Sequence, residues 1–144
     1  MLDVGAGSGI LAMVALRLGA ASALGVECDP VAVACARDYA TENRFGDNLE
    51  FRCGTLGEVD RQGELRPDVV LANLDRQTLL LLCQELAQYV SHGTRLLLSG
   101  ILLDQEQEIV EAFSKVGAML FQRRELEGWV ALGLLKVESC AGVS

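Results

Sequence analysis

Residues 3–9 read DVGAGSG, in which a short apolar strand runs into a glycine-rich turn, and an Ala- and Leu-rich helix is predicted to follow over residues 8–18. Glycine is needed where the backbone takes a positive φ or where a ligand lies directly against main-chain N–H groups. Three glycines at alternate positions therefore predict a bare backbone surface that holds a nucleotide-like ligand. A tight strand-to-helix connection is the simpler alternative for the same residues.

The spacing of these glycines distinguishes between ligands. A dinucleotide-binding turn of the form G-x-G-x-x-G would have its third glycine at position 10, which is Ile10, whereas the glycine here is Gly9. With an acid at Asp3, the pattern acid-x-G-x-G-x-G resembles motif I of class I S-adenosylmethionine (SAM) methyltransferases. The resemblance implies that SAM lies against residues 5–9 (Gly5, Ala6, Gly7, Ser8 and Gly9) and that Asp3 meets its cationic methionine end.

Length and composition restrict the class of protein. The chain has 144 residues, half of them hydrophobic, and a net charge of −8, which predicts one domain with a proper core. The acidic surface disfavours nucleic acid as a partner and would attract a basic protein, although it could serve solubility alone. The sequence contains neither a membrane-spanning stretch nor a secretion signal, so we expect a cytoplasmic protein.

Cysteine and histidine usage gives two further expectations. The five cysteines are odd in number and mostly lie inside apolar segments, so we expect reduced, buried side chains. A single histidine, His92, and the lack of a C-x-x-C pair disfavour a zinc site, and no metal is expected.

Apolar runs alternate with helical patterns along the whole chain, which predicts an α/β fold. Strands are expected at 1–4, 22–26, 49–53, 68–72, 95–98, 119–124 and 129–137, and helices at 8–18, 30–42, 77–90 and 104–116, with a short helical turn within 55–67. The last two strands form a hairpin through residues 125–128. This order predicts a Rossmann-like, mostly parallel seven-stranded sheet with helices on both faces and a C-terminal antiparallel hairpin.

Ligands of such sheets bind beyond the carboxyl ends of the strands. Glu27 ends the second strand, and its carboxylate could accept hydrogen bonds from both hydroxyls of a ribose. Asp29, before Pro30, is better explained as a helix cap. Residues 54–56 follow the third strand, where Gly54 permits close approach, Thr55 could bond an adenine edge and Leu56 could cover its face. A plain turn explains these three residues nearly as well.

Asn73 follows the fourth strand and is the candidate catalytic residue. Its side-chain carbonyl could accept a hydrogen bond from an attacking amine and orient the nitrogen toward the methyl group. A turn-forming asparagine is an equally good explanation from position alone.

Nearly the whole chain is similar to the catalytic domain of the PrmA family, SAM-dependent methyltransferases that modify amino groups of a ribosomal protein. The resembling segments are LDVGAGSGIL (2–11), GVECDPVAV (25–33), ANL (72–74), LSGIL (98–102) and WVAL (129–132). The resemblance implies cofactor contacts at Asp3, Gly5, Gly7 and Glu27, at Cys28 within the second segment, and at Leu56, with Asn73 facing the transferred methyl. It implies a protein substrate, with a basic ribosomal protein as the candidate, and leaves a homo-oligomer open.

Two departures from the family keep alternatives open. The family places a substrate-recruiting domain before motif I, and we expect this domain to be absent here, where the chain begins inside the first strand. Residues 74–77 read LDRQ, a charged stretch where relatives tend to be small and apolar. A SAM-binding remnant or partner subunit without catalysis is therefore the main alternative. An NAD-dependent oxidoreductase is disfavoured by Ile10 and by the terminal hairpin.

Overall fold

The computed structural model describes residues 1–90 and 93–136, and its backbone forms one seven-stranded sheet with the order β3-β2-β1-β4-β5-β7-β6. The chain divides into two compact units, of which the first is Met1–Asn73 and the second begins at Leu74. The predicted fold class is confirmed, including the antiparallel strands at the end of the chain. We describe the two units separately below.

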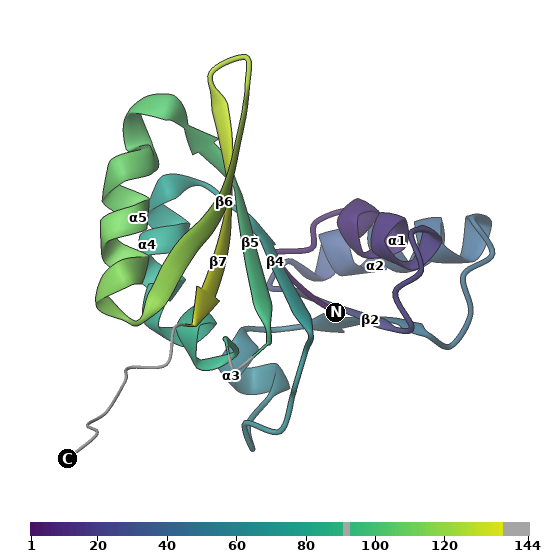
Figure 1. Ribbon diagram of the computed structural model, residues 1–144. Coiled ribbons are helices and arrows are strands. Elements are labelled where there is room, and N and C mark those ends of the chain that lie inside the picture. Colours follow the sequence, from purple (N-terminus) through teal and green to yellow (C-terminus); the bar gives the residue numbers. More distant parts are fainter. Residues whose placement is uncertain (91–92, 137–144) are drawn as a thin grey trace. The chain divides into compact units, whose positions relative to one another are not determined.

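The first unit alternates strands and helices around a parallel sheet. Its elements are β1 (Leu2–Val4), α1 (Ile10–Arg17), β2 (Ala23–Glu27), α2 (Pro30–Glu42), β3 (Leu49–Cys53), α3 (Leu56–Val59) and β4 (Val69–Asn73). Strand β1 pairs in parallel with β2 on one side and with β4 on the other, and β2 pairs with β3. Figure 1 shows α1 and α2 together on one face of this part of the sheet.

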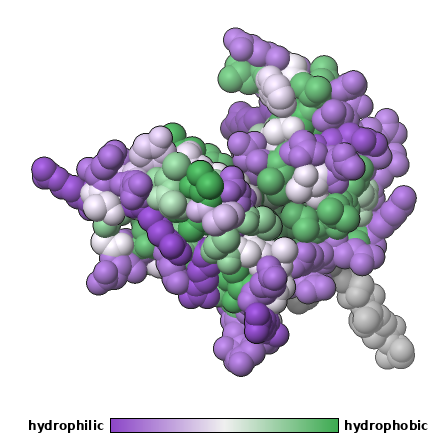
Figure 2. All heavy atoms as spheres, turned by 180° about the vertical axis from the view of Figure 1, so that it is seen from behind, coloured by the Kyte–Doolittle hydropathy of each residue, from purple (hydrophilic) through white to green (hydrophobic). Residues whose placement is uncertain are grey.

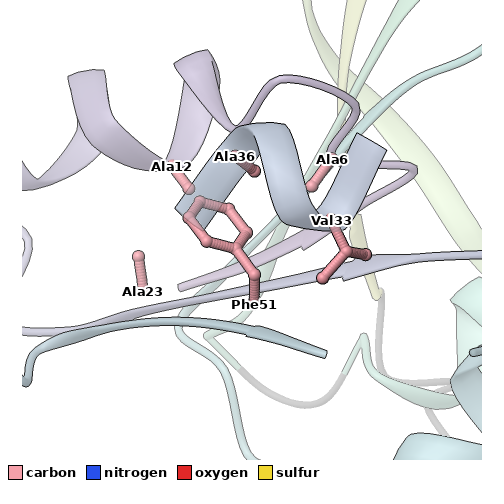
Figure 3. Packing of buried hydrophobic residues seen from close by; sticks show 6 residues of the cluster. All are labelled: Ala6, Ala12, Ala23, Val33, Ala36 and Phe51. Atoms are coloured by element: carbon pink, nitrogen blue, oxygen red, sulfur yellow. The ribbon is translucent and has the colours of Figure 1, made fainter. Parts of the chain in front are cut away.

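The core beneath these two helices is built almost entirely from small side chains. Phe51 points from β3 toward the helices and is surrounded by alanines and one valine (Figure 3). Its buried neighbours are Ala6, Ala12, Ala23, Val33 and Ala36. Small residues at these positions let the helix backbones approach the sheet closely around a single aromatic ring.

The second unit packs two helices against a largely antiparallel sheet (Figure 1). Its elements are α4 (Arg76–Gln88), β5 (Arg95–Leu102), a 3₁₀ turn η1 (Leu103–Gln105), α5 (Glu106–Lys115), β6 (Ala118–Leu126) and β7 (Trp129–Lys136). Val130, Leu132 and Leu134 alternate along β7 and are buried, as are Ile109 and Phe113 of α5. This periodicity of two in the strand and four in the helix directs one face of each into a common core.

Several predicted boundaries were wrong by a few residues. Helix α1 begins at Ile10 rather than Ser8, because Gly9 has a φ of 77° and cannot be helical. Strand β5 continues to Leu102, since residues beyond a bulge after Leu98 pair again with β7. The hairpin loop contains only Glu127 and Gly128, both with positive φ, as tight two-residue hairpins require. The predicted end of the last strand at residue 137 lies outside the described residues.

The predicted burial of the cysteines was wrong for three of them. Cys83 on α4 is buried, whereas Cys28, Cys35 and Cys53 are exposed. Cys140 lies outside the described residues. An apolar segment does not fix which of its residues face solvent, particularly where a strand ends.

The surface combines hydrophilic and hydrophobic side chains. On the face shown in Figure 2, hydrophobic atoms reach the surface in patches among the hydrophilic ones. Exposed large apolar residues include Ile10, Leu18, Val31, Leu126 and Trp129. Over the described part of the chain, the helices all fall short of the length and hydrophobicity that crossing a membrane would take.

Candidate functional site

The turn between β1 and α1 is held by backbone hydrogen bonds to the end of β2. The amides of Gly5 and Ala6 both donate to the carbonyl of Val26, at 2.9 and 3.1 Å. Gly5, Gly7 and Gly9 have φ values of 70°, 53° and 77°, a region that side chains with a Cβ rarely adopt. The turn therefore needs glycine for its backbone shape before any ligand is considered.

Gly7 and Gly9 differ in what surrounds them. A Cβ on Gly9 would stand 2.4 Å from Cζ of Phe51, whereas a Cβ on Gly7 would meet no atom within 4 Å. Phe51 therefore fills the space beside Gly9, and the predicted ligand contact of the three glycines stays a prediction. At Gly7 the turn is open.

Gly25 on β2 shares the environment of Gly9. Its Cβ would lie 2.4 Å from the Phe51 ring and 2.9 Å from Cβ of Ala6. The ring thus fills the space that Gly9 and Gly25 leave between helix, turn and strand. This contact was not predicted from the sequence. A single aromatic residue in β3, opposite segments rich in Ala and Gly, is a signal for it.

Glu27, at the end of β2, links the turn to the next helix. Its Oε2 accepts a hydrogen bond from the amide of Gly7 and its Oε1 accepts one from the amide of Asp29, both at 3.0 Å. A carboxylate has about four acceptor positions, so each oxygen can accept a further donor. The predicted ribose contact is compatible with this arrangement and stays a prediction.

Asp29 is a helix cap, as predicted. Its Oδ1 accepts a hydrogen bond from the amide of Val31 at 2.8 Å, and Pro30 occupies the first helical position. The cap fixes where α2 begins and so fixes the backbone that Glu27 contacts.

Asp3 is the buried acid of the site, with only 1 % of its surface exposed. Burial raises its pKa to about 6; the amide of Ala12 opposes this shift by hydrogen bonding, and the charge of Glu27 adds to it. Within residues 1–90 and 93–136, its Oδ2 has no hydrogen-bond partner. An unpartnered carboxylate oxygen is costly in a protein interior, and a cation or donor placed beside it would relieve that cost.

Residues 54–56 connect β3 to α3. Gly54, with a φ of 139°, donates its amide to the carbonyl of Glu27 at 2.9 Å. Thr55 caps α3 in a reciprocal arrangement with Glu58: the Glu58 amide donates to the Thr55 hydroxyl, and Oε2 of Glu58 accepts from the Thr55 amide at 2.8 Å. Leu56 is 3 % exposed and packs inward.

The adenine contacts proposed for these three residues stay predictions. The cap occupies the Thr55 hydroxyl, and the burial of Leu56 leaves little of its side chain available to a ring. The capping role of Glu58 was not predicted, although Thr-x-x-Glu at the start of a helix is a recognised capping signal.

Of the remaining predicted residues, one is buried and three are exposed. Ala6 belongs to the core around Phe51, so only its backbone is available to a ligand. Ser8 is exposed on the turn, Cys28 is exposed just after β2, and Asn73 is the exposed last residue of β4. Among the described residues, no group of three or more His, Cys, Asp or Glu side chains is arranged to hold a metal ion.

Solved structures with a similar fold are methyltransferases. A ribosomal protein L11 methylase from Lactobacillus delbrueckii subsp. bulgaricus superposes with a TM-score of 0.85 at 25 % identity, covering 95 % of this chain and 69 % of that one. An RNA methyltransferase from Salinibacter ruber, solved with S-adenosyl-L-homocysteine, gives a TM-score of 0.73 at 26 % identity, over 99 % and 84 % of the two chains. These neighbours show that the chain has the fold of a SAM-dependent methyltransferase domain.

Sequence comparison identifies the family to which the chain belongs. The family model described as ribosomal protein L11 methyltransferase (PrmA) matches residues 1–136, and the chain belongs to this family. The ribosomal protein L11 methyltransferase of Chromohalobacter salexigens is 40 % identical over 132 residues, which are 92 % of this chain and 43 % of the relative. The chain thus spans less than half the length of the curated relatives it matches.

Proposed function

We propose that this chain binds SAM at the carboxyl ends of β1, β2 and β3 and transfers its methyl group to amino groups of a protein substrate. The observation that carries the proposal is the combination of an open Gly7 with a buried Asp3 whose Oδ2 has no partner among the described residues. The solved L11 methylase and the curated L11 methyltransferases support a ribosomal protein as substrate.

The residues of the first unit fit this cofactor. Gly7 offers close approach to the backbone, Glu27 retains acceptor positions for ribose hydroxyls, and Asp3 would relieve its unpartnered oxygen beside a cationic group. When bound, SAM supplies a methyl group on a sulfonium, which is an excellent leaving group. The protein then contributes mainly by holding the two reactants close in the correct orientation.

Asn73 is proposed to orient the acceptor amine. It is exposed at the end of β4, one position beyond Ala72, which is register-paired with Val4 of β1. Its amide oxygen would accept a hydrogen bond from the amine and so direct the nitrogen lone pair. A lysine must be neutral to attack, and an apolar environment at the acceptor would favour that form.

The experiment is a transfer assay with radiolabelled SAM and a mixture of basic ribosomal proteins. We expect label in protein with the unmodified chain and with Asn48→Ala, an exposed asparagine directly before β3 that lies away from the strand ends of the site. Asn73→Ala should lower the rate at least tenfold while SAM binding persists. Unchanged turnover in Asn73→Ala would contradict the role of this residue, and SAM binding without any transfer would favour the non-catalytic alternative.

An NAD-dependent oxidoreductase has less support. Ile10 stands where a dinucleotide-binding turn needs glycine, and the matched relatives and structures described above are methyltransferases.

A further inference from the structure

Two exposed cysteines lie at neighbouring strand ends in the first unit. Cys28 follows the last residue of β2, and Cys53 is the last residue of β3. The two strands are parallel, and Glu27 is the register partner of Cys53. The cysteines are 25 residues apart in sequence but are one residue out of register across adjacent strands.

Each thiol already contacts a backbone carbonyl of the other cysteine or of its neighbour. Sγ of Cys53 lies 3.6 Å from the carbonyl oxygen of Cys28, and Sγ of Cys28 lies 3.4 Å from the carbonyl oxygen of Gly54. Ordinary strand spacing and rise place the two Cα atoms about 6 Å apart. Disulfides join Cα atoms over roughly 4.4–6.8 Å. Because side chains one residue out of register point to opposite faces of a sheet, a bond here also requires a backbone turn at Cys28, which lies beyond the last residue of β2.

We propose that Cys28 and Cys53 form a reversible disulfide across the carboxyl ends of β2 and β3. The oxidant is a small-molecule disulfide such as oxidised glutathione. The thiolate of one cysteine attacks it, which forms a mixed disulfide and releases one reduced glutathione. The thiolate of the second cysteine then attacks the mixed disulfide, which closes the protein disulfide and releases a second glutathione. Two protein thiols are oxidised and one glutathione disulfide is reduced.

The position of the bond gives it a regulatory consequence, which rests on the proposed function. It would join residues directly beside Glu27 and Gly54, the proposed contacts of the ribose and of the adenine. Forming it moves both thiols away from the carbonyls that they contact and changes the backbone directly after Glu27. We therefore expect the oxidised chain to bind SAM at least tenfold more weakly than the reduced chain.

Bond formation is tested in a Cys35→Ser/Cys140→Ser background, which retains Cys28, Cys53 and the buried Cys83. After incubation with oxidised glutathione, peptide mapping without reductant should show the Cys28 and Cys53 peptides linked, with the loss of two thiols. Cys28→Ser in the same background should abolish the linkage while circular dichroism shows an intact fold. Glutathione left on either cysteine as a mixed disulfide, or a bond to Cys83, would overturn the proposal.

The regulatory consequence is tested by calorimetric titration of SAM into the reduced and the oxidised forms of that background. Weaker binding after oxidation, reversed by dithiothreitol, is the expected result. Equal affinity in a chain that has the mapped disulfide would overturn the regulation. Failure of both forms to bind SAM would instead contradict the proposed function and leave the disulfide standing.

Discussion

The cluster beneath α1 and α2 in the first unit and the core of the second unit bury very different side chains. The first unit surrounds Phe51 with alanines, one valine and two Cβ-less positions, Gly9 and Gly25. The second unit is filled with large aliphatic and aromatic residues, namely Leu79, Leu86, Leu96, Leu98, Ile101, Ile109, Phe113, Leu132 and Leu134. Small core residues bring the backbone close enough to form the turn at Gly7, whereas large ones contribute more apolar burial per residue. The cluster around Phe51 thus combines small side chains with the close backbone approach on which the turn between β1 and α1 depends.

The largest expected effect is at the tight contact of the first unit. Gly9→Ala would add left-handed strain of about 1–2 kcal/mol and overpacking against Phe51 of about 1–3 kcal/mol, a total loss of about 2–5 kcal/mol in the free energy of unfolding. Gly117→Ala in the second unit is the matched control, because its φ of 85° is similar and no atom lies within 4 Å. Equal losses in urea denaturation would contradict the packing role of Gly9.

A second effect concerns the buried acid of the first unit. The pKa of Asp3 is raised to about 6 from 3.8, so the native state binds its proton more tightly than the unfolded state. The contribution of this group to stability is therefore fully present below about pH 4 and is lost as the pH rises through 6, at a cost of up to about 3 kcal/mol.

Asp3→Asn removes this titration. In the absence of ligand, the variant should be more stable than the unmodified chain at pH 8 and nearly equal to it at pH 4. Thermal unfolding at the two pH values measures the difference, and Asp38→Asn, at an exposed position of α2, is the control. A difference independent of pH would show that burial does not perturb Asp3.

Gly7→Ala separates folding from binding within the same turn. Its φ of 53° imposes left-handed strain of about 1–2 kcal/mol, and the absence of any atom within 4 Å adds no clash. The new methyl would occupy the space proposed for SAM, so we expect a small loss of stability with at least a tenfold loss of SAM affinity. Gly19→Ala is the control. Its φ is 103° and no atom lies within 4 Å, so it imposes backbone strain at a position outside the proposed SAM site. Tight SAM binding by Gly7→Ala would place the ligand elsewhere.

The smallest effect is expected at a surface ion pair of the second unit. Arg76 contacts Glu108 through two hydrogen bonds, but the two side chains are 42 % and 49 % exposed. Exposed pairs contribute between about 0 and 1 kcal/mol. A double-mutant cycle of Arg76→Gln and Glu108→Gln should give a coupling energy in that range, decreasing with salt. A coupling energy above about 2 kcal/mol would contradict this, and would mean that the stability of the second unit depends on this ion pair as well as on its apolar core.

The sequence predicted the features that depend on local pattern. Strand and helix periodicity gave the order of the elements, and the spacing of Gly5, Gly7 and Gly9 gave a turn that the structure places at the end of β1. The Asp29 cap followed from the proline behind it. Such signals lie within a few residues of one another, so neither register nor packing is needed to interpret them.

What the sequence did not give depends on contacts between distant segments. The contact of Phe51 with Gly9 and Gly25 requires the register of β3 on β2 and the approach of α1. The exposure of Cys28 and Cys53 depends on where two strands end, which hydrophobicity alone does not fix. The hydrogen bond from the Gly7 amide to Glu27 crosses 20 residues and shows that the acid organises the turn as well as being a candidate ligand contact.

The most direct test of the account is calorimetric titration of the reduced 144-residue chain at pH 7.5 with SAM and, separately, with NAD. The account predicts saturable 1:1 binding of SAM, lost in Gly7→Ala and retained in Gly19→Ala, with no heat of binding from NAD. Binding of NAD, or the lack of SAM binding by a chain that circular dichroism shows to be folded, would contradict the claim that the turn between β1 and α1 holds SAM.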